Sequence, residues 1–209
     1  ARVASDAASG RPGQQPADRR GVALVYLGDI IDRGPHSAHV LDRLCAPAPA
    51  GVARLVLRGN HEDMFLEFLS APRRHVAWLD FGGAETLASY GVYLTPRRVR
   101  AARERDLLRE LSASIPRAHV DLLRAAPRAA RAGAWRLTHA GLDPDRPDSA
   151  QRPEDVSWGA AGDLTERAGG AGPLIFGHFA AGAARVAGLT ACVDAGAHVT
   201  GRLGVAVLD

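Results

Sequence analysis

The sequence contains no lysine, since all 26 of its basic residues are arginine. Arginine, alanine, glycine and proline have GC-rich codons and are abundant, so genome composition explains the formal charge of +3 without a polyanionic ligand. We therefore expect no nucleic-acid partner. The sequence also has no apolar run near the roughly eighteen residues that cross a bilayer, so we expect no membrane partner.

Cysteine is scarce. Cys45 and Cys192 lie far apart without CxxC spacing, which indicates neither a disulfide framework nor a zinc knuckle and favours a reducing compartment. Residues 1–20 are small, polar and rich in arginine, without the apolar stretch of a signal peptide. We therefore predict a cytoplasmic protein.

The length allows one domain with a sizeable core, and we predict a single domain over residues 1–209. The apolar run from Gly21 to Gly28 predicts a strand buried on both faces. A helix over His36–Ala46 and a strand over Val52–Gly59 would follow. Such a unit favours parallel strands, with functional groups in the loops at their carboxyl ends.

The rest of the chain alternates helical and extended patterns. Helices are expected at 61–71, 96–114 and 116–126, and short strands at 135–141, 173–179, 190–197 and 202–209, the last of which closes the sheet system. Strands and helices interleaved early, with strands dominating late, predict an α/β fold with a mixed sheet or two sheets flanked by helices.

Four expected strand ends each carry a possible metal ligand. These are Asp29 in GDIIDRG, Asn60 in GNHE, His139 in THAG and His178 in FGHF. A single histidine at such a place is more often an ordinary core or surface residue, but four possible ligands at successive strand ends are not expected by chance. Carboxylate, amide oxygen and imidazole together suit a first-row divalent ion.

The order GDxxDRG, GNHE, HAG and GH resembles the phosphoprotein phosphatase branch of the calcineurin-like metallophosphoesterase superfamily, and most of all the bacterial serine/threonine protein phosphatases. The resemblance extends through Gly82–Gly91 and Val193–Leu203. It implies the calcineurin-like fold, in which mixed β-sheets are sandwiched between α-helices.

The resemblance also implies a dinuclear metal centre. Asp29 would bridge two divalent ions, and Asn60, His139 and His178 would complete the second metal site, with Asn60 also contacting the substrate phosphate. Manganese is the family expectation, and the same ligands accept iron or zinc. Metal-bound hydroxide would be the nucleophile.

Three further residues match catalytic and substrate-binding positions of the family. His61 matches the general acid that protonates the leaving alkoxide, and Asp32 matches the carboxylate that orients its imidazole. Arg33 matches the arginine whose planar fork binds phosphate oxygens.

The sequence departs from the family pattern in several places. The opening GDxHG motif, which supplies ligands to the first metal, is absent, since Asp6 is followed by alanines, and we interpret the chain as N-terminally truncated. A Trp-x-Arg segment is replaced by Trp158, Gly159 and Ala160, and GHFA at Gly177–Ala180 stands where Gly-His-Thr-Pro is common.

Three functions remain open on these residues. The leading one is metal-dependent hydrolysis of phosphomonoesters, with a phosphorylated protein or a small phosphoester as substrate. A related bacterial branch that shares the motifs suggests a dinucleoside polyphosphate hydrolase instead. The missing opening motif and arginine suggest a third, a catalytically impaired protein that binds metal or phosphorylated partners.

Overall fold

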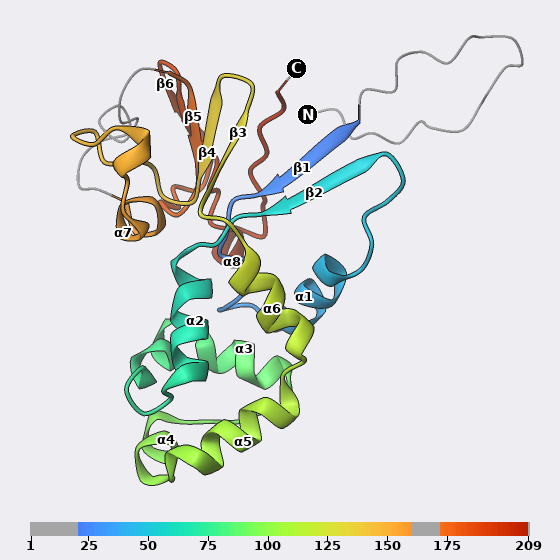
Figure 1. Cartoon of the computed structure of the whole chain (residues 1–209), viewed down its shortest axis with the longest axis vertical. Helices are drawn as coiled ribbons and strands as arrows, with labels where there is room; N and C mark the ends of the chain where they lie inside the picture. The colour runs from blue at the N-terminus through green and yellow to red at the C-terminus, as the bar shows by residue number, and fades with distance from the viewer. Residues whose placement is uncertain (1–20, 160–171, 209) are drawn as a thin grey trace, which may run out of the picture.

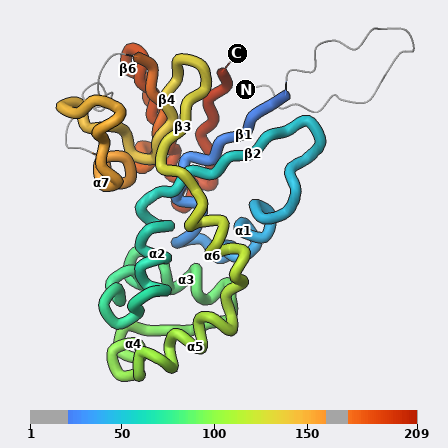
Figure 2. Tube along the Cα trace, in the orientation of Figure 1, coloured from blue at the N-terminus to red at the C-terminus, as the bar shows by residue number. Residues whose placement is uncertain are grey.

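The computed structural model describes residues 21–159 and 172–208 (Figure 1). The strands gather at one end of the molecule and helices α2 to α6 at the other, as the Cα trace also shows (Figure 2). The expectations for residues 1–20 and for Ala160 lie outside the described residues. None of the helices in the described ranges is long and apolar enough to span a membrane.

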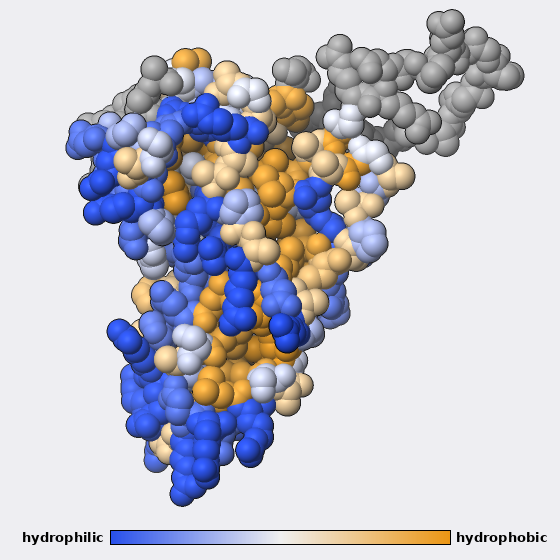
Figure 3. Space-filling view, viewed as in Figure 1, coloured by the Kyte–Doolittle hydropathy of each residue, from blue (hydrophilic) through white to orange (hydrophobic). Residues whose placement is uncertain are grey.

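The predicted strand–helix–strand unit is present. Strand β1 (Val22–Tyr26), helix α1 (Ser37–Cys45) and strand β2 (Val52–Val56) follow one another, and β1 pairs with β2 in parallel. The prediction that the first strand is buried on both faces is wrong, because Val22 is 63% and Leu24 43% exposed. Among the described strands β1 pairs with β2 alone, so apolar side chains over this pair remain at the surface (Figure 3).

A helical region follows β2 and holds the largest core cluster. Its elements are α2 (Asn60–Ser70), the 3-10 helix η1 (Val76–Phe81), α3 (Gly83–Ser89), α4 (Pro96–Ala101), α5 (Glu104–Ser114) and α6 (Arg117–Ala125). The Trp78 ring packs against Phe65 and Phe68 with centroids 5.3 and 4.9 Å apart. This contact holds η1 against α2, and α3 follows η1 directly in the chain.

The single helix expected over residues 96–114 is two helices. Ala102 has an extended backbone with ψ 157°, which ends α4 although neither glycine nor proline stands there. The resulting turn lets α4 pack on η1 while α5 packs on α2. Tertiary packing therefore overrides a continuous helical pattern.

The second sheet contains five strands in the order β3-β4-β5-β7-β6. They are β3 (Ala129–Ala132), β4 (Trp135–Thr138), β5 (Leu174–Phe176), β6 (Arg185–Ala187) and β7 (Thr190–Cys192). The three central strands run parallel and both edge strands run antiparallel, which confirms the predicted α/β fold with mixed sheets. Leu57, Leu137 and Ile175 form the core between the two sheets.

The final strand expected over residues 202–209 is wrong for the described part of that segment. Residues 202–208 adopt no strand, and Val205 and Val207 are 73% and 82% exposed. The segment passes against Val193 at Gly204, where an added Cβ would overlap the Val193 carbonyl. Strand β7 offers no edge there because β5 and β6 already occupy both of its sides. The remaining short elements are η2 (Asp148–Ala150), α7 (Pro153–Ser157) and α8 (Ala197–Thr200).

Candidate metal centre

The carboxyl ends of four strands meet at one place and bring the predicted ligands together. Asp29 follows β1, Asn60 begins α2 after β2, His139 follows β4 and His178 follows β5. The ends of β1 and β2 can approach closely because Gly28 has φ 96° and no Cβ; an added Cβ would lie 2.6 Å from the Gly59 nitrogen.

The geometry of His139 decides what this cluster can bind. Its Nδ1 lies 2.7 Å from the Leu27 carbonyl, which only accepts, so Nδ1 carries a hydrogen and Nε2 is the nitrogen that can bind an ion when the ring is neutral. That Nε2 lies 3.2 Å from Asp29 Oδ2, 3.1 Å from Asn60 Oδ1 and 3.1 Å from His178 Nδ1. Ligand atoms of Asp29, His139 and His178 all lie within 4.8 Å of one another. Such convergence of electron-pair donors fits a divalent cation.

Titration of the three side chains bears on ligation in different ways. Burial works to lower the pKa of His139, but the hydrogen bond and charge of Asp29 outweigh it and raise that pKa, so a cation bound there would displace a proton. Burial lowers the pKa of His178 to about 4, and the charge of His139 acts in the same direction. Burial works to raise the pKa of Asp29, but the hydrogen bond and charge of His139, with the charge of His61, outweigh it and lower that pKa. A neutral imidazole and an ionised carboxylate are the forms that bind metal.

Glu62 supports the site structurally, although the sequence analysis assigned it no role there. Its side chain is fully buried and accepts backbone N–H groups of Asp29 at 2.9 Å, Ile30 at 2.8 Å and Gly59 at 2.8 Å. Burial raises its pKa to about 7, and the charge of Asp29 adds to the shift. Glu62 thus ties the loop after β1 to the loop after β2, and only its place in GNHE marked it in the sequence.

His61 and Asp32 form a close pair beside the candidate metal ligands. The His61 Nδ1 donates to Asp32 Oδ2 at 2.6 Å, which leaves Nε2 facing the site. Asp32 also accepts from Trp78 Nε1 at 2.7 Å and from Thr86 Oγ1 at 2.6 Å. Burial works to lower the pKa of His61, but the hydrogen bond to Asp32 and the charges of Asp29 and Asp32 outweigh it and raise that pKa. The imidazole is therefore held in an orientation that suits an acid.

Arg33 lies between two imidazoles. Its Nη2 is 3.3 Å from His61 Nε2 and its Nη1 is 3.4 Å from His198 Nε2. His198 belongs to α8, which begins after Gly196 at φ 67°. The sequence reasoning missed this exposed histidine, because nothing in its own neighbourhood distinguishes it; only the fold brings it to Arg33.

A family model described as calcineurin-like phosphoesterase matches residues 12–179. The chain belongs to this family. A crystal structure of a "putative diadenosine tetraphosphatase" superposes on the phosphoesterase chain with a TM-score of 0.51 and 22% sequence identity, over 84% of this chain and 71% of that one. At this identity the likeness shows the fold. No curated protein matches the chain.

Backbone strain marks the phosphoesterase site independently of its motifs. Among the described residues, the non-glycine residues with a left-handed backbone are Asp29 (φ 52°), Asp32 (φ 71°), Arg33 (φ 63°) and His178 (φ 66°). All four were predicted from the sequence as site residues. Residues held in this region cost stability and persist where the surrounding structure enforces them, often at functional sites.

Replacing Thr86 with valine should lower kcat about tenfold with a smaller change in KM, because Asp32 loses a buried donor and then holds His61 less firmly. Steady-state kinetics on a small phosphomonoester would measure this. Thr86→Ser keeps the hydroxyl and should restore most of the activity. A Thr86→Val variant with unchanged kcat would show that Asp32 does not need Thr86 to orient the imidazole.

Proposed function

We propose that this phosphoesterase hydrolyses phosphomonoesters at a dinuclear metal centre and that its substrates are phosphoserine or phosphothreonine residues of proteins. Membership of the family supports metal-dependent phosphoester hydrolysis. The observation that carries the proposal is that three groups of residues lie side by side. They are the converging candidate metal ligands, the His61–Asp32 pair, and Arg33 next to His61.

The converging donors fit one divalent ion, which Asp29, Asn60, His139 and His178 would hold. Asp29 would also contribute to a first ion, whose other ligands the resemblance places in the missing opening motif. Bound ions supply Lewis acidity and lower the pKa of water. We propose manganese, with iron or zinc as alternatives.

The side chains around the ions have separable tasks. The Arg33 guanidinium presents a planar fork to phosphate oxygens, and the Asn60 amide adds a further contact. His61 Nε2 lies on the same side as Arg33 and would give its proton to the leaving oxygen. Asp32 would stabilise the imidazolium before that transfer, because its carboxylate is buried against Nδ1.

A dinucleoside polyphosphate hydrolase is the second candidate, and the name of the structural neighbour favours it. The two readings differ in the leaving group, a protein hydroxyl or a nucleotide. Rates on a phosphothreonine peptide and on diadenosine tetraphosphate, measured side by side, would separate them.

Asp29→Asn should reduce manganese-dependent hydrolysis of p-nitrophenyl phosphate by at least about 100-fold, because a neutral amide neither bridges nor charge-balances the ions. The assay uses the protein with and without added Mn²⁺. Asp121→Asn is a matched control, since Asp121 is an exposed partner of Arg117 on α6. A wild type that binds manganese yet hydrolyses neither this ester nor a phosphopeptide would overturn the proposal and favour the impaired phosphatase-like protein.

A further inference from the structure

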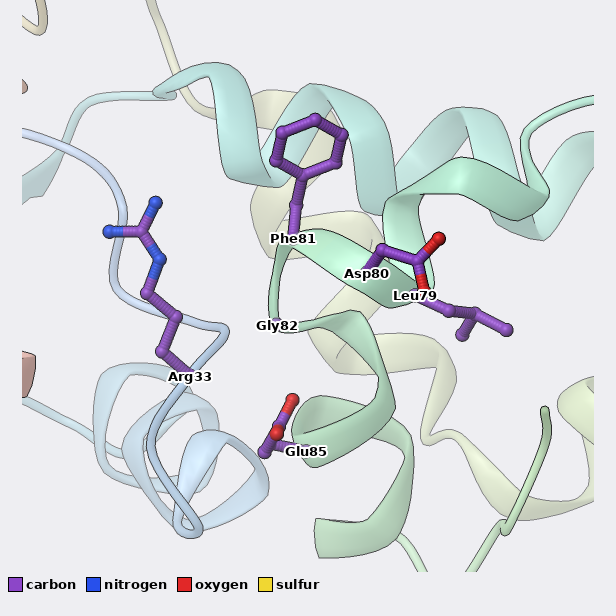
Figure 4. A pocket seen from close by; sticks show the side chains of 6 residues that line it. All are labelled: Arg33, Leu79, Asp80, Phe81, Gly82 and Glu85. Carbon is purple, nitrogen blue, oxygen red and sulfur yellow. The ribbon is translucent and has the colours of Figure 1, made fainter. Parts of the chain in front are cut away.

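A pocket of about 330 Å³ adjoins Arg33 on the side of η1 and α3 (Figure 4). Its lining is Arg33, Leu79, Asp80, Phe81, Gly82 and Glu85. The volume lies at the lower end of the range for small-ligand sites, about 300–1,000 Å³. Because Arg33 belongs both to this lining and to the contact with His61, the pocket opens directly beside the position expected for the substrate phosphate.

The backbone fixes where the pocket lies relative to Arg33. The Arg33 N–H donates to the Gly82 carbonyl at 3.2 Å. Gly82 has φ 107°, and an added Cβ there would come within 2.5 Å of the Arg33 nitrogen. The end of η1 and the start of α3 are therefore held against the Arg33 turn, and the groups that they carry keep a fixed distance from the phosphate-binding side chain.

Besides Arg33, the pocket lining carries two acidic side chains. Asp80 and Glu85 supply two exposed carboxylates, and within the described part of the chain neither has an ion-pair partner. Phe81, which lies between them in sequence, is 51% exposed, so part of its ring is accessible to a ligand. Carboxylates and accessible aromatic rings are groups that bind a guanidinium or an ammonium ion.

We propose that this pocket binds an arginine or lysine side chain adjacent to the phosphorylated residue of a peptide substrate. The inference rests on the proposed phosphatase function. An extended peptide advances about 3.3–3.6 Å per residue, so a neighbouring residue can reach a pocket that shares Arg33 with the phosphate site. A polyphosphate chain fits less well: its first phosphate would engage Arg33, and its further negative charges would then meet the carboxylates of Asp80 and Glu85.

The test compares two phosphothreonine peptides of equal length, one with arginines flanking the phosphothreonine and one with glutamates. The wild-type chain loaded with Mn²⁺ should show a kcat/KM about tenfold higher for the arginine peptide at low salt. The double variant Asp80→Asn/Glu85→Gln should bring this ratio to about two or less, and Glu67→Gln/Asp121→Asn, which changes exposed carboxylates elsewhere, should keep it. A ratio of two kcat/KM values cancels any general loss of activity.

Hydrolysis of p-nitrophenyl phosphate by the same preparation separates the possible failures. If the wild type hydrolyses neither this ester nor the peptides, the proposed function is wrong, and the pocket assignment that rests on it is wrong as well. If it hydrolyses the ester but shows no preference for the arginine peptide, only the pocket assignment is wrong. Efficient cleavage of diadenosine tetraphosphate that falls in Phe81→Ala and rises in the double variant would identify the pocket as a nucleobase site and overturn the inference.

Discussion

His61→Ala should lower kcat by about 10²–10⁴-fold on a substrate with a poor leaving group, such as a phosphothreonine peptide or phenyl phosphate. The alkoxide that departs from such a substrate needs a proton, and His61 Nε2 is the group placed to give it. On p-nitrophenyl phosphate the loss should be much smaller, since that phenolate is stable without protonation. Steady-state kinetics on matched aryl esters would measure the difference.

The comparison between leaving groups makes the test specific. His39→Ala, an exposed histidine on α1, should leave both rates unchanged and serves as the control. A His61→Ala variant that loses the same factor on every ester would contradict the acid role. It would indicate that the imidazole instead acts through Asp29, whose Oδ2 lies 3.9 Å from His61 Nε2.

Glu62→Gln should lower the free energy of unfolding by about 2–4 kcal/mol. The glutamine amide nitrogen would face backbone N–H donors that now share the carboxylate oxygens, so at least one buried donor of Asp29, Ile30 or Gly59 would lose its acceptor. Urea denaturation monitored by tryptophan fluorescence would measure the change, because Trp78 packs on the same helix.

Glu67→Gln is the matched control on α2. The Glu67 side chain is 58% exposed and pairs with His75 at 3.3 Å, so its replacement should change the unfolding free energy by less than about 0.5 kcal/mol. If Glu62→Gln behaved like Glu67→Gln, the three amide hydrogen bonds would not be what joins the two loops.

Local sequence was sufficient to find the residues that stand at strand ends. The sequence predicts that four residues lie together, because parallel strands end at the same edge and because the motifs resemble those of a family. These residues are Asp29, Asn60, His139 and His178. The same reasoning could not supply Trp78 and Thr86, which reach Asp32 from 46 and 54 positions away through η1 and α3. Nothing in their own neighbourhood marks them as partners of a catalytic carboxylate.

The failures of the fold prediction have a common physical origin. The apolar run of β1 was expected to be covered on both faces, yet coverage depends on a neighbour that a local pattern does not reveal. Residues 202–208 alternate like a strand but meet a sheet whose nearest edge is occupied. Strand β3, made of alanine and arginine, was missed because pairing with β4 forms it despite poor β propensity.

The strained backbone at Asp29, Asp32, Arg33 and His178 has a consequence for any laboratory selection on this protein. Each left-handed residue costs on the order of 1–3 kcal/mol, and glycine at the same position removes much of that cost. A selection for heat resistance alone should therefore enrich glycine at Arg33, whose side chain is exposed, and a selection for turnover should eliminate the same variant. At Asp32 glycine should not be enriched, because the buried donors Trp78 Nε1 and Thr86 Oγ1 would lose their acceptor.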